Sequence, residues 1–230
     1  MMRPFRCLFA AVLAAGLLVS PVSAGGPSGP VQPMDVARPA DLPAIGKWMI
    51  GPDGQIAHWL GQIVDGKALR EPINVIIIDC ISASPEEAVR RIEAAASAAG
   101  YPVRFGHSAG YRAMIGDRLI GQIPSNRDSA FSNDLFELTN NHGRMFGPYQ
   151  FANSYIFTGA FSRERVRVEP LRHAFDSFIQ ARDDFSRQLS GKSEFKLSGV
   201  VNLGNAIVGE PEIGTADHDG FAVLLRTTSH

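Results

Sequence analysis

An unbroken, largely β-branched run, residues 73–78, constrains the fold of this chain more than any other segment. Such a run is typical of a strand that is buried on both faces. Ser84 then provides a helix N-cap, and Pro85 occupies the first helical position. Apolar residues recur at helical spacing until Gly100 ends the helix. These signals predict a strand, a helix and a second, short strand at residues 102–105.

The rest of the chain is expected to be mainly antiparallel sheet. Residues 111–115 and 118–123 flank Gly116-Asp117 and predict a two-residue hairpin. Further strands are predicted at residues 151–161, 196–203 and 221–226, and a second helix at about 177–189. Two helices among about six strands, most of them linked by hairpins, indicate an α+β fold. We expect an antiparallel-rich mixed sheet with two main helices packed on one face.

The N-terminus predicts export. Two arginines precede an apolar run at residues 7–19, and Val22 and Ala24 then fit the small-residue pattern of a signal peptidase site. The run is shorter than the ~20 residues that a membrane-spanning helix needs, which disfavours an uncleaved anchor. We therefore expect a signal peptide at residues 1–24, a flexible leader at residues 25–44, and a single α+β domain at residues 45–230. The mature protein would be periplasmic or secreted.

Composition narrows the range of partners. The formal net charge of the chain is −1, and removal of the two signal-peptide arginines makes it more negative. This balance argues against nucleic acid and against attachment to an anionic membrane surface. No later apolar run is long enough for a transmembrane anchor. Cys80 is the only cysteine outside the predicted signal, so we expect a buried free thiol and no internal disulfide.

Two short spans, residues 126–144 and 172–183, concentrate histidine, arginine and aspartate. Histidine with aspartate suits general acid–base chemistry, and arginine near a helix N-terminus suits anion binding. The candidate catalytic residues are His142, His173 and Asp176. The candidate ligand-binding residues are Arg127, Asn141, Arg144, Arg182 and Asp183. The alternative is a structural network, because ion pairs imitate functional clusters.

Two other motifs carry weaker signals. Gly106 to Gly110 match the G-x-S-x-G pattern of serine hydrolases, but the helix that should follow Ser108 is missing, so we interpret the segment as a loop. Asp217, His218 and Asp219 could ligate a metal, but Asp-Gly between apolar runs first of all predicts a turn. The choice between metal and turn stays open. No metal is assigned, and the sequence identifies no cofactor.

The order of several short motifs resembles the LssY C-terminal-like domain. The motifs are Glu71-Pro72-Ile73-Asn74-Val75-Ile76, Ala98-Ala99-Gly100-Tyr101, Arg127-Asp128, Asn141-His142-Gly143-Arg144-Met145-Phe146, Gly159-Ala160, His173-Ala174-Phe175-Asp176 and Ala181-Arg182-Asp183. The resemblance covers roughly residues 71–189. Phe146 departs from the tryptophan expected near that position, and Gln180-Ala181 stands where an acidic residue is usual. The resemblance implies an envelope association and lipid or phosphate chemistry, and it defines no reaction.

These observations favour an exported, envelope-associated domain with a His/Arg/Asp pocket. The pocket would bind an anionic small molecule or lipid headgroup, such as one bearing a phosphate, and could hydrolyse it. One alternative is a non-catalytic envelope or secretion accessory protein. A second is a serine hydrolase that uses Ser108.

The predicted signal peptide can be tested by mass. Expressed in a bacterial host with a secretory pathway, the protein should be cleaved after Ala24, because the small-residue pattern ends there. Intact-mass measurement of periplasmic or secreted material should give a chain that begins at Gly25. A full-length, membrane-bound product would contradict export by a cleaved signal.

Overall fold

A computed structural model describes residues 35–125, 128–168 and 171–227. The predicted signal peptide, the leader up to residue 34 and Arg127 lie outside the described residues. The elements in chain order are β1 (Val36–Ala37), β2 (Ile45–Gly46), β3 (His58–Val64), β4 (Lys67–Arg70), β5 (Val75–Asp79), α1 (Pro85–Ala98), β6 (Val103–Phe105), β7 (Arg112–Ile115), β8 (Arg118–Ile123), β9 (Ser129–Ser132), β10 (Asn140–Phe151), β11 (Ser154–Val168), β12 (Leu171–Ser177), α2 (Phe178–Lys192), β13 (Phe195–Asn202), β14 (Ile213–Gly214) and β15 (Phe221–Thr227).

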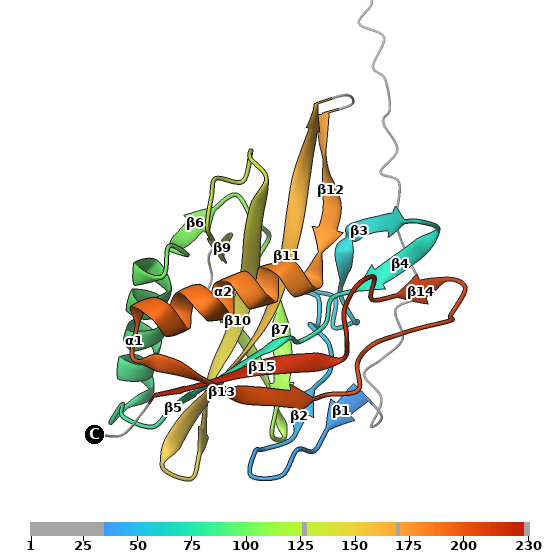
Figure 1. Ribbon diagram of the computed structural model, residues 1–230. Helices are drawn as coiled ribbons and strands as arrows, with labels where there is room; N and C mark the ends of the chain where they lie inside the picture. The colour runs from blue at the N-terminus through green and yellow to red at the C-terminus, as the bar shows by residue number, and fades with distance from the viewer. Residues whose placement is uncertain (1–34, 126–127, 169–170, 228–230) are drawn as a thin grey trace, which may run out of the picture.

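One large, curled sheet organises the domain (Figure 1). Its strand order is β1-β2-β7-β8-β10-β11-β5-β15-β13, with β12 paired to β11, β9 to β10, and β6 to β9. The pairing of β5 with β15 is parallel, and the other pairs in this sheet are antiparallel. A smaller sheet has the order β14-β4-β3. The structure confirms an α+β fold with a mixed, largely antiparallel sheet.

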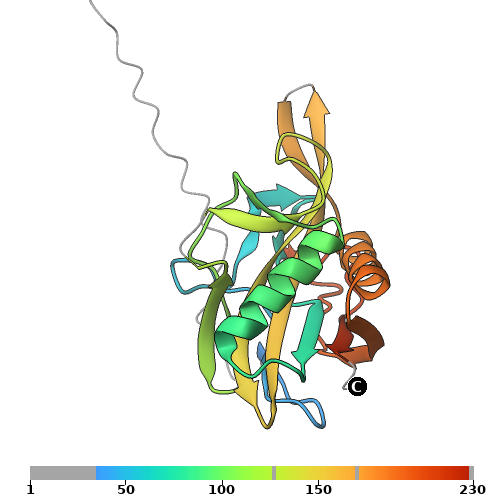
Figure 2. The same ribbon diagram turned by 90° about the vertical axis from the view of Figure 1, so that its left-hand side faces the viewer.

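Strand β5 is the predicted β-branched strand, and every residue in it is buried. Val75 and Ile77 pack in one apolar cluster with side chains from both helices, while Ile76 and Ile78 pack in a second cluster. This division follows from the alternation of side chains along a strand. Figure 1 shows α2 crossing in front of the central strands, and Figure 2 shows α1 lying diagonally across the molecule.

The caps of α1 and the hairpin of β7 and β8 form where the sequence predicts them. The Ser84 side chain accepts a hydrogen bond from the Glu87 backbone N–H, and Pro85 begins the helix. The second strand of the predicted unit, β6, does not join β5. Both neighbouring positions of β5 are occupied, by β11 and β15, so the chain leaving α1 pairs with β9 instead.

Two local expectations differ from the structure. Cys80 is a free thiol, but it is half-buried, because it follows the last residue of β5 where the chain leaves the core. Residues 36–37 of the predicted leader pair with β2, so this part of the leader belongs to the sheet. In the described part of the chain, neither helix has the length and apolar composition needed to cross a bilayer.

The pairing of the long strands β10 and β11 determines which way the polar side chains of β10 point. Gly143 lies opposite Phe161, and a Cβ atom on Gly143 would lie 2.4 Å from the Phe161 ring. The glycine therefore lets the aromatic ring pack closely on the core side of β10. By strand alternation, Asn140, His142 and Arg144 point to the opposite face.

Candidate functional site

A cavity of about 250 Å³ lies on this opposite face of β10. It is formed by β3, β10 and β11, by the residue that follows β4, and by the loops before β7 and before β10. Its lining residues are Trp59, Leu60, Glu71, Gly106, His107, Ser108, Tyr111, Phe136, His142, Arg144 and Glu164. Two residues predicted from the sequence, His142 and Arg144, therefore line one cavity.

A hydrogen-bond network fixes the protonation of His142. Asn140 Nδ2 donates to Glu164 Oε1 and to the Leu138 carbonyl, each at 2.8 Å. The Asn140 amide oxygen is therefore the acceptor that lies 2.9 Å from His142 Nδ1. The neutral imidazole must carry its proton on Nδ1, which leaves Nε2 with a lone pair. Burial lowers the pKa of His142 well below its usual value, and His107, Arg144 and His173 lower it further.

Glu164 connects His142 to His173. Its position on β11 is directly opposite Asn140, and burial raises the pKa of its carboxyl group. His173 Nδ1 lies 3.2 Å from Glu164 Oε2, and the His173 ring stacks on Phe136 at 4.3 Å between ring centroids. His173 thus lies beside the cavity, in contact with two of its lining residues. No sequence signal distinguished Glu164 from the other charged residues of β11.

The loop before β7 contributes His107 and Ser108. The backbone N–H groups of Gly106 and His107 donate to the Asp128 carbonyl, which holds the loop against the start of β9. The His107 ring lies 4.8 Å from the His142 ring, and its buried Nε2 has no hydrogen-bond partner among the described residues. Burial, with Arg144 and His173 nearby, lowers the pKa of His107 to about 4. The G-x-S-x-G pattern points only to Ser108, and no sequence signal identifies the adjacent His107.

Arg144 is the only arginine or lysine among the lining residues, and its side chain is only 7% exposed. Its Nε and Nη2 donate to the Ser108 carbonyl at 3.3 and 3.2 Å, and Nη2 also donates to Ser108 Oγ at 3.3 Å. The guanidinium carbon lies 4.2 Å from the centre of the Tyr111 ring. Within the described residues, Arg144 forms no ion pair with a carboxylate.

Glu71 is the second carboxyl group of the lining. It is buried just after the end of β4, and burial raises its pKa to about 7, against the opposing influence of Arg144. Near neutral pH a substantial fraction of Glu71 is therefore uncharged. Its only sequence signal was its place at the start of the motif order that resembles the LssY C-terminal-like domain.

The other predicted site residues lie elsewhere. Asp176 pairs with Arg163 and Arg165 at 2.9 and 2.5 Å. Asn141 points to the core side of β10, where its Nδ2 donates to Tyr101 and Asp184. Arg182 pairs with Asp183 and Asp219, each at 2.7 Å. Arg163 donates to both Asp176 and Asn141, whereas Arg182 and Asp183 belong to a separate ionic network, so the structure does not bring the whole predicted set into one site.

The two weaker motifs also have defined places. Residues 106–110 form a loop, and the Ser108 hydroxyl contacts Tyr111 Oη at 3.2 Å as well as Arg144. Asp217 accepts hydrogen bonds from Ser177 Oγ and from the Phe178 backbone N–H, and so caps α2. His218 Nε2 lies 2.8 Å from Asn205 Oδ1. Among the described residues, no group of three or more His, Cys, Asp or Glu side chains is arranged to hold a metal ion.

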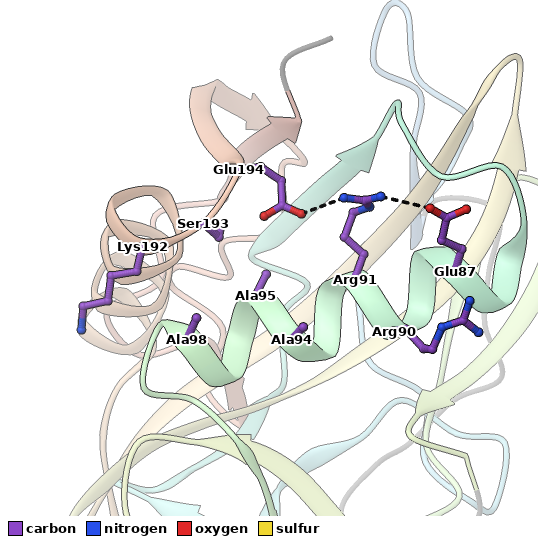
Figure 3. Close-up of a pocket in the computed structure, with 9 residues that line it drawn as sticks. All are labelled: Glu87, Arg90, Arg91, Ala94, Ala95, Ala98, Lys192, Ser193 and Glu194. Atoms are coloured by element: carbon purple, nitrogen blue, oxygen red, sulfur yellow. Dashed lines mark hydrogen bonds and ion pairs between the residues drawn. The ribbon is translucent and has the colours of Figure 1, made fainter. Parts of the chain in front are cut away.

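A larger hollow, of about 480 Å³, lies between α1 and the residues that end α2 (Figure 3). Its central cation, Arg91, pairs with Glu87 at 3.1 Å and with Glu194 at 3.2 Å. Arg90 points away from this group in Figure 3, and the rest of the floor is largely alanine. Because the central cation of this hollow, Arg91, is already balanced by Glu87 and Glu194, we place the candidate site at the smaller cavity around Arg144.

Comparison of this chain with protein-family models, with curated proteins and with solved structures gives no match. The chemistry of the site is therefore argued from its own geometry.

Glu71 provides a test of the cavity's electrostatics. A carboxyl group with a pKa near 7 in the folded chain and 4.5 as its usual value binds its proton more tightly when folded, so its ionisation destabilises the fold as the pH rises. Glu71→Gln removes that effect. The free energy of unfolding of the variant, relative to the parent, should rise by roughly 3 kcal/mol between pH 4 and pH 8.5.

Chemical denaturation at a series of pH values measures this difference. The exposed Glu210 gives a matched control, because Glu210→Gln makes the same chemical change outside the cavity. A Glu71→Gln difference that stays constant over this pH range would show that Glu71 is not shifted by burial.

Proposed function

We propose that this chain is an exported, envelope-associated domain whose cavity binds a small anionic ligand that bears a phosphate group. The observation that carries the proposal is Arg144, a buried cation that lines a cavity and forms no ion pair with a carboxylate among the described residues, although Glu71 and Glu164 line the same cavity and interact with it at longer range. Arginine remains charged when buried and offers planar donors that match phosphate and carboxylate oxygens.

The charges around Arg144 support an external anion. Burying an unpaired charge is unfavourable, so buried charges normally have a counter-charge. His107 and His142 are neutral at pH 7 because burial lowers their pKa values, and burial raises the pKa of both lining carboxyl groups, Glu71 and Glu164, which weakens them as counter-charges. Arg182 shows the contrast, since two aspartates neutralise it. A bound anion would give Arg144 the counter-charge that the described residues do not provide within ion-pair distance.

The cavity also limits the size of the ligand. Its volume of about 250 Å³ falls below the ~300–1,000 Å³ typical of sites for drug-sized molecules. It corresponds to roughly eight water molecules at liquid density. We infer that the cavity holds one anionic group with a small part of whatever carries it.

Export and the envelope association rest on the predicted signal peptide at residues 1–24, together with the resemblance to the LssY C-terminal-like domain. The predicted signal peptide would place the protein outside the cytoplasm, and the resemblance implies lipid or phosphate chemistry there. A protein that binds the ligand without turning it over would be an accessory protein of the envelope.

Hydrolysis of the ligand is a second candidate function, favoured by His142. Its Nδ1 proton is fixed by Asn140, so Nε2 can accept a proton from a water molecule whose oxygen attacks the phosphorus of a phosphate monoester, while the ester P–O bond breaks and the ester oxygen leaves with the alcohol portion. The Ser108 hydroxyl contacts Tyr111 and Arg144, neither of which is a general base at neutral pH. The geometry therefore favours water over Ser108 as the nucleophile.

Binding can be tested by thermal shift. Inorganic phosphate should raise the melting temperature of the parent protein, because a ligand that binds only the folded state stabilises it. Arg144→Ala should abolish the phosphate-dependent shift. Arg182→Ala is the matched control: it should destabilise the ligand-free protein by about 2 kcal/mol through its lost ionic hydrogen bonds and keep the shift. A parent protein without a shift, together with a strongly destabilised Arg144→Ala variant, would make Arg144 a bracing residue.

Turnover can be tested with a chromogenic aryl phosphate. Release of inorganic phosphate by the parent should fall roughly a hundredfold or more in His142→Gln, since general base catalysis contributes about that factor. Ser108→Ala should retain most of the rate. Loss of the rate in Ser108→Ala instead would support the serine hydrolase, and no release by any form would leave binding as the function.

A further inference from the structure

Strand β3 forms one wall of the cavity, and its backbone is irregular there. Leu60 has φ 47° and Gly61 has φ 63°, both in the left-handed region. They lie where the register with β4 shifts, between the pairs His58↔Arg70 and Ile63↔Ala68. Glycine adopts this conformation readily, but leucine rarely does. Such strained residues persist where the surrounding structure holds them, often at ligand sites.

The irregularity has a consequence for the cavity. Consecutive residues of a regular strand point to opposite faces, yet Trp59 and Leu60 both line the same cavity. Trp59 is buried at 1% exposure, while Leu60 is 52% exposed. The left-handed turn at Leu60 thus brings an exposed apolar side chain to the cavity beside a buried indole. Bulges of this kind commonly redirect a side chain next to a functional site.

Trp59 adds a second, independent observation. Its indole Nε1 is buried and has no hydrogen-bond partner among the described residues. A buried tryptophan N–H usually has an acceptor, because leaving it unpaired is unfavourable. The indole can only donate, and its ring lies beside Leu60 in the apolar wall of the cavity.

We propose that the ligand of this cavity is an anion with a hydrocarbon substituent, such as an alkyl phosphate monoester, bound as a single molecule. Its anionic group is held by Arg144. Its hydrocarbon part lies against Leu60 and Phe136. This assignment rests on the proposed function and specifies the chemical class of its ligand.

The polar and the apolar lining residues of the cavity come from different segments, as the two parts of the ligand require. The cation and the neutral histidines come from β10 and the loop before β7, while Trp59, Leu60 and Phe136 form apolar walls from other segments. Inorganic phosphate could use the polar groups only. An alkyl chain would also cover the exposed surface of Leu60, and that burial strengthens binding.

Calorimetric titration of the full mature chain with inorganic phosphate, ethyl phosphate and hexyl phosphate tests the proposal. We expect hexyl phosphate to bind at least tenfold more tightly than inorganic phosphate, since complete burial of two methylene groups corresponds to roughly tenfold in affinity. Leu60→Asn should remove most of that gain. Asparagine tolerates the left-handed conformation, so this variant keeps the local backbone.

Leu197→Asn is the matched control, because Leu197 is 53% exposed on β13 and does not line the cavity. It should retain the full preference for hexyl phosphate. Equal affinities for inorganic and hexyl phosphate, or a preference that Leu60→Asn leaves intact, would overturn the inference and preserve the anion site. Failure of every phosphate to bind would overturn the proposed function as well. Binding only to vesicles that contain phosphatidic acid would replace the single-molecule ligand with a membrane surface.

Discussion

The register between β10 and β11 places Gly143 against the Phe161 ring, and both the core and the cavity depend on that contact. Any side chain at position 143 would collide with the ring, so the absence of a Cβ atom allows the two strands to pack on the core. The same alternation turns His142 and Arg144 toward the cavity. One pairing therefore separates the apolar side of β10 from its polar side.

Three buried or half-buried arginines of the described residues, Arg182, Arg91 and Arg144, differ in how their charge is balanced. Arg182 meets two aspartates, and Arg91 meets two glutamates together with the buried Asp79. Arg144 instead donates to a backbone carbonyl and a hydroxyl and contacts an aromatic ring. The ion pairs of Arg182 and Arg91 link parts of the fold to one another and need no ligand to balance their charge. The third leaves positive charge beside a cavity, which is why we place the ligand there.

Neutral histidines line the cavity beside Arg144. His107 and His142 can donate or accept hydrogen bonds without adding charge at pH 7, because burial lowers their pKa values. The Asn140–Glu164 pair fixes one tautomer of His142. The cavity thus combines a permanent cation with neutral histidines and two buried carboxyl groups.

The sequence alone determined those elements that depend on residues close together in the chain. The β-branched run at β5, the serine and proline that begin α1, and the Gly116-Asp117 turn each act through residues that are neighbours in the chain. The spacing of His142 and Arg144 also fixed their common face, because strand alternation needs no distant partner. The sequence could not separate Arg144 from Arg182, since both are arginines in polar segments.

Only the tertiary structure decided which polar residues share a cavity. His107, Glu71 and Trp59 lie far from β10 in the chain and reach the site through loops and strand pairings that no local pattern encodes. The position of β6 beside β9 was likewise set by the neighbours that already occupy both sides of β5. Charge balance depends on distance and burial, which are properties of the folded chain. For that reason the composition of the polar segments was visible in the sequence, whereas the unpaired cation became visible only in the fold.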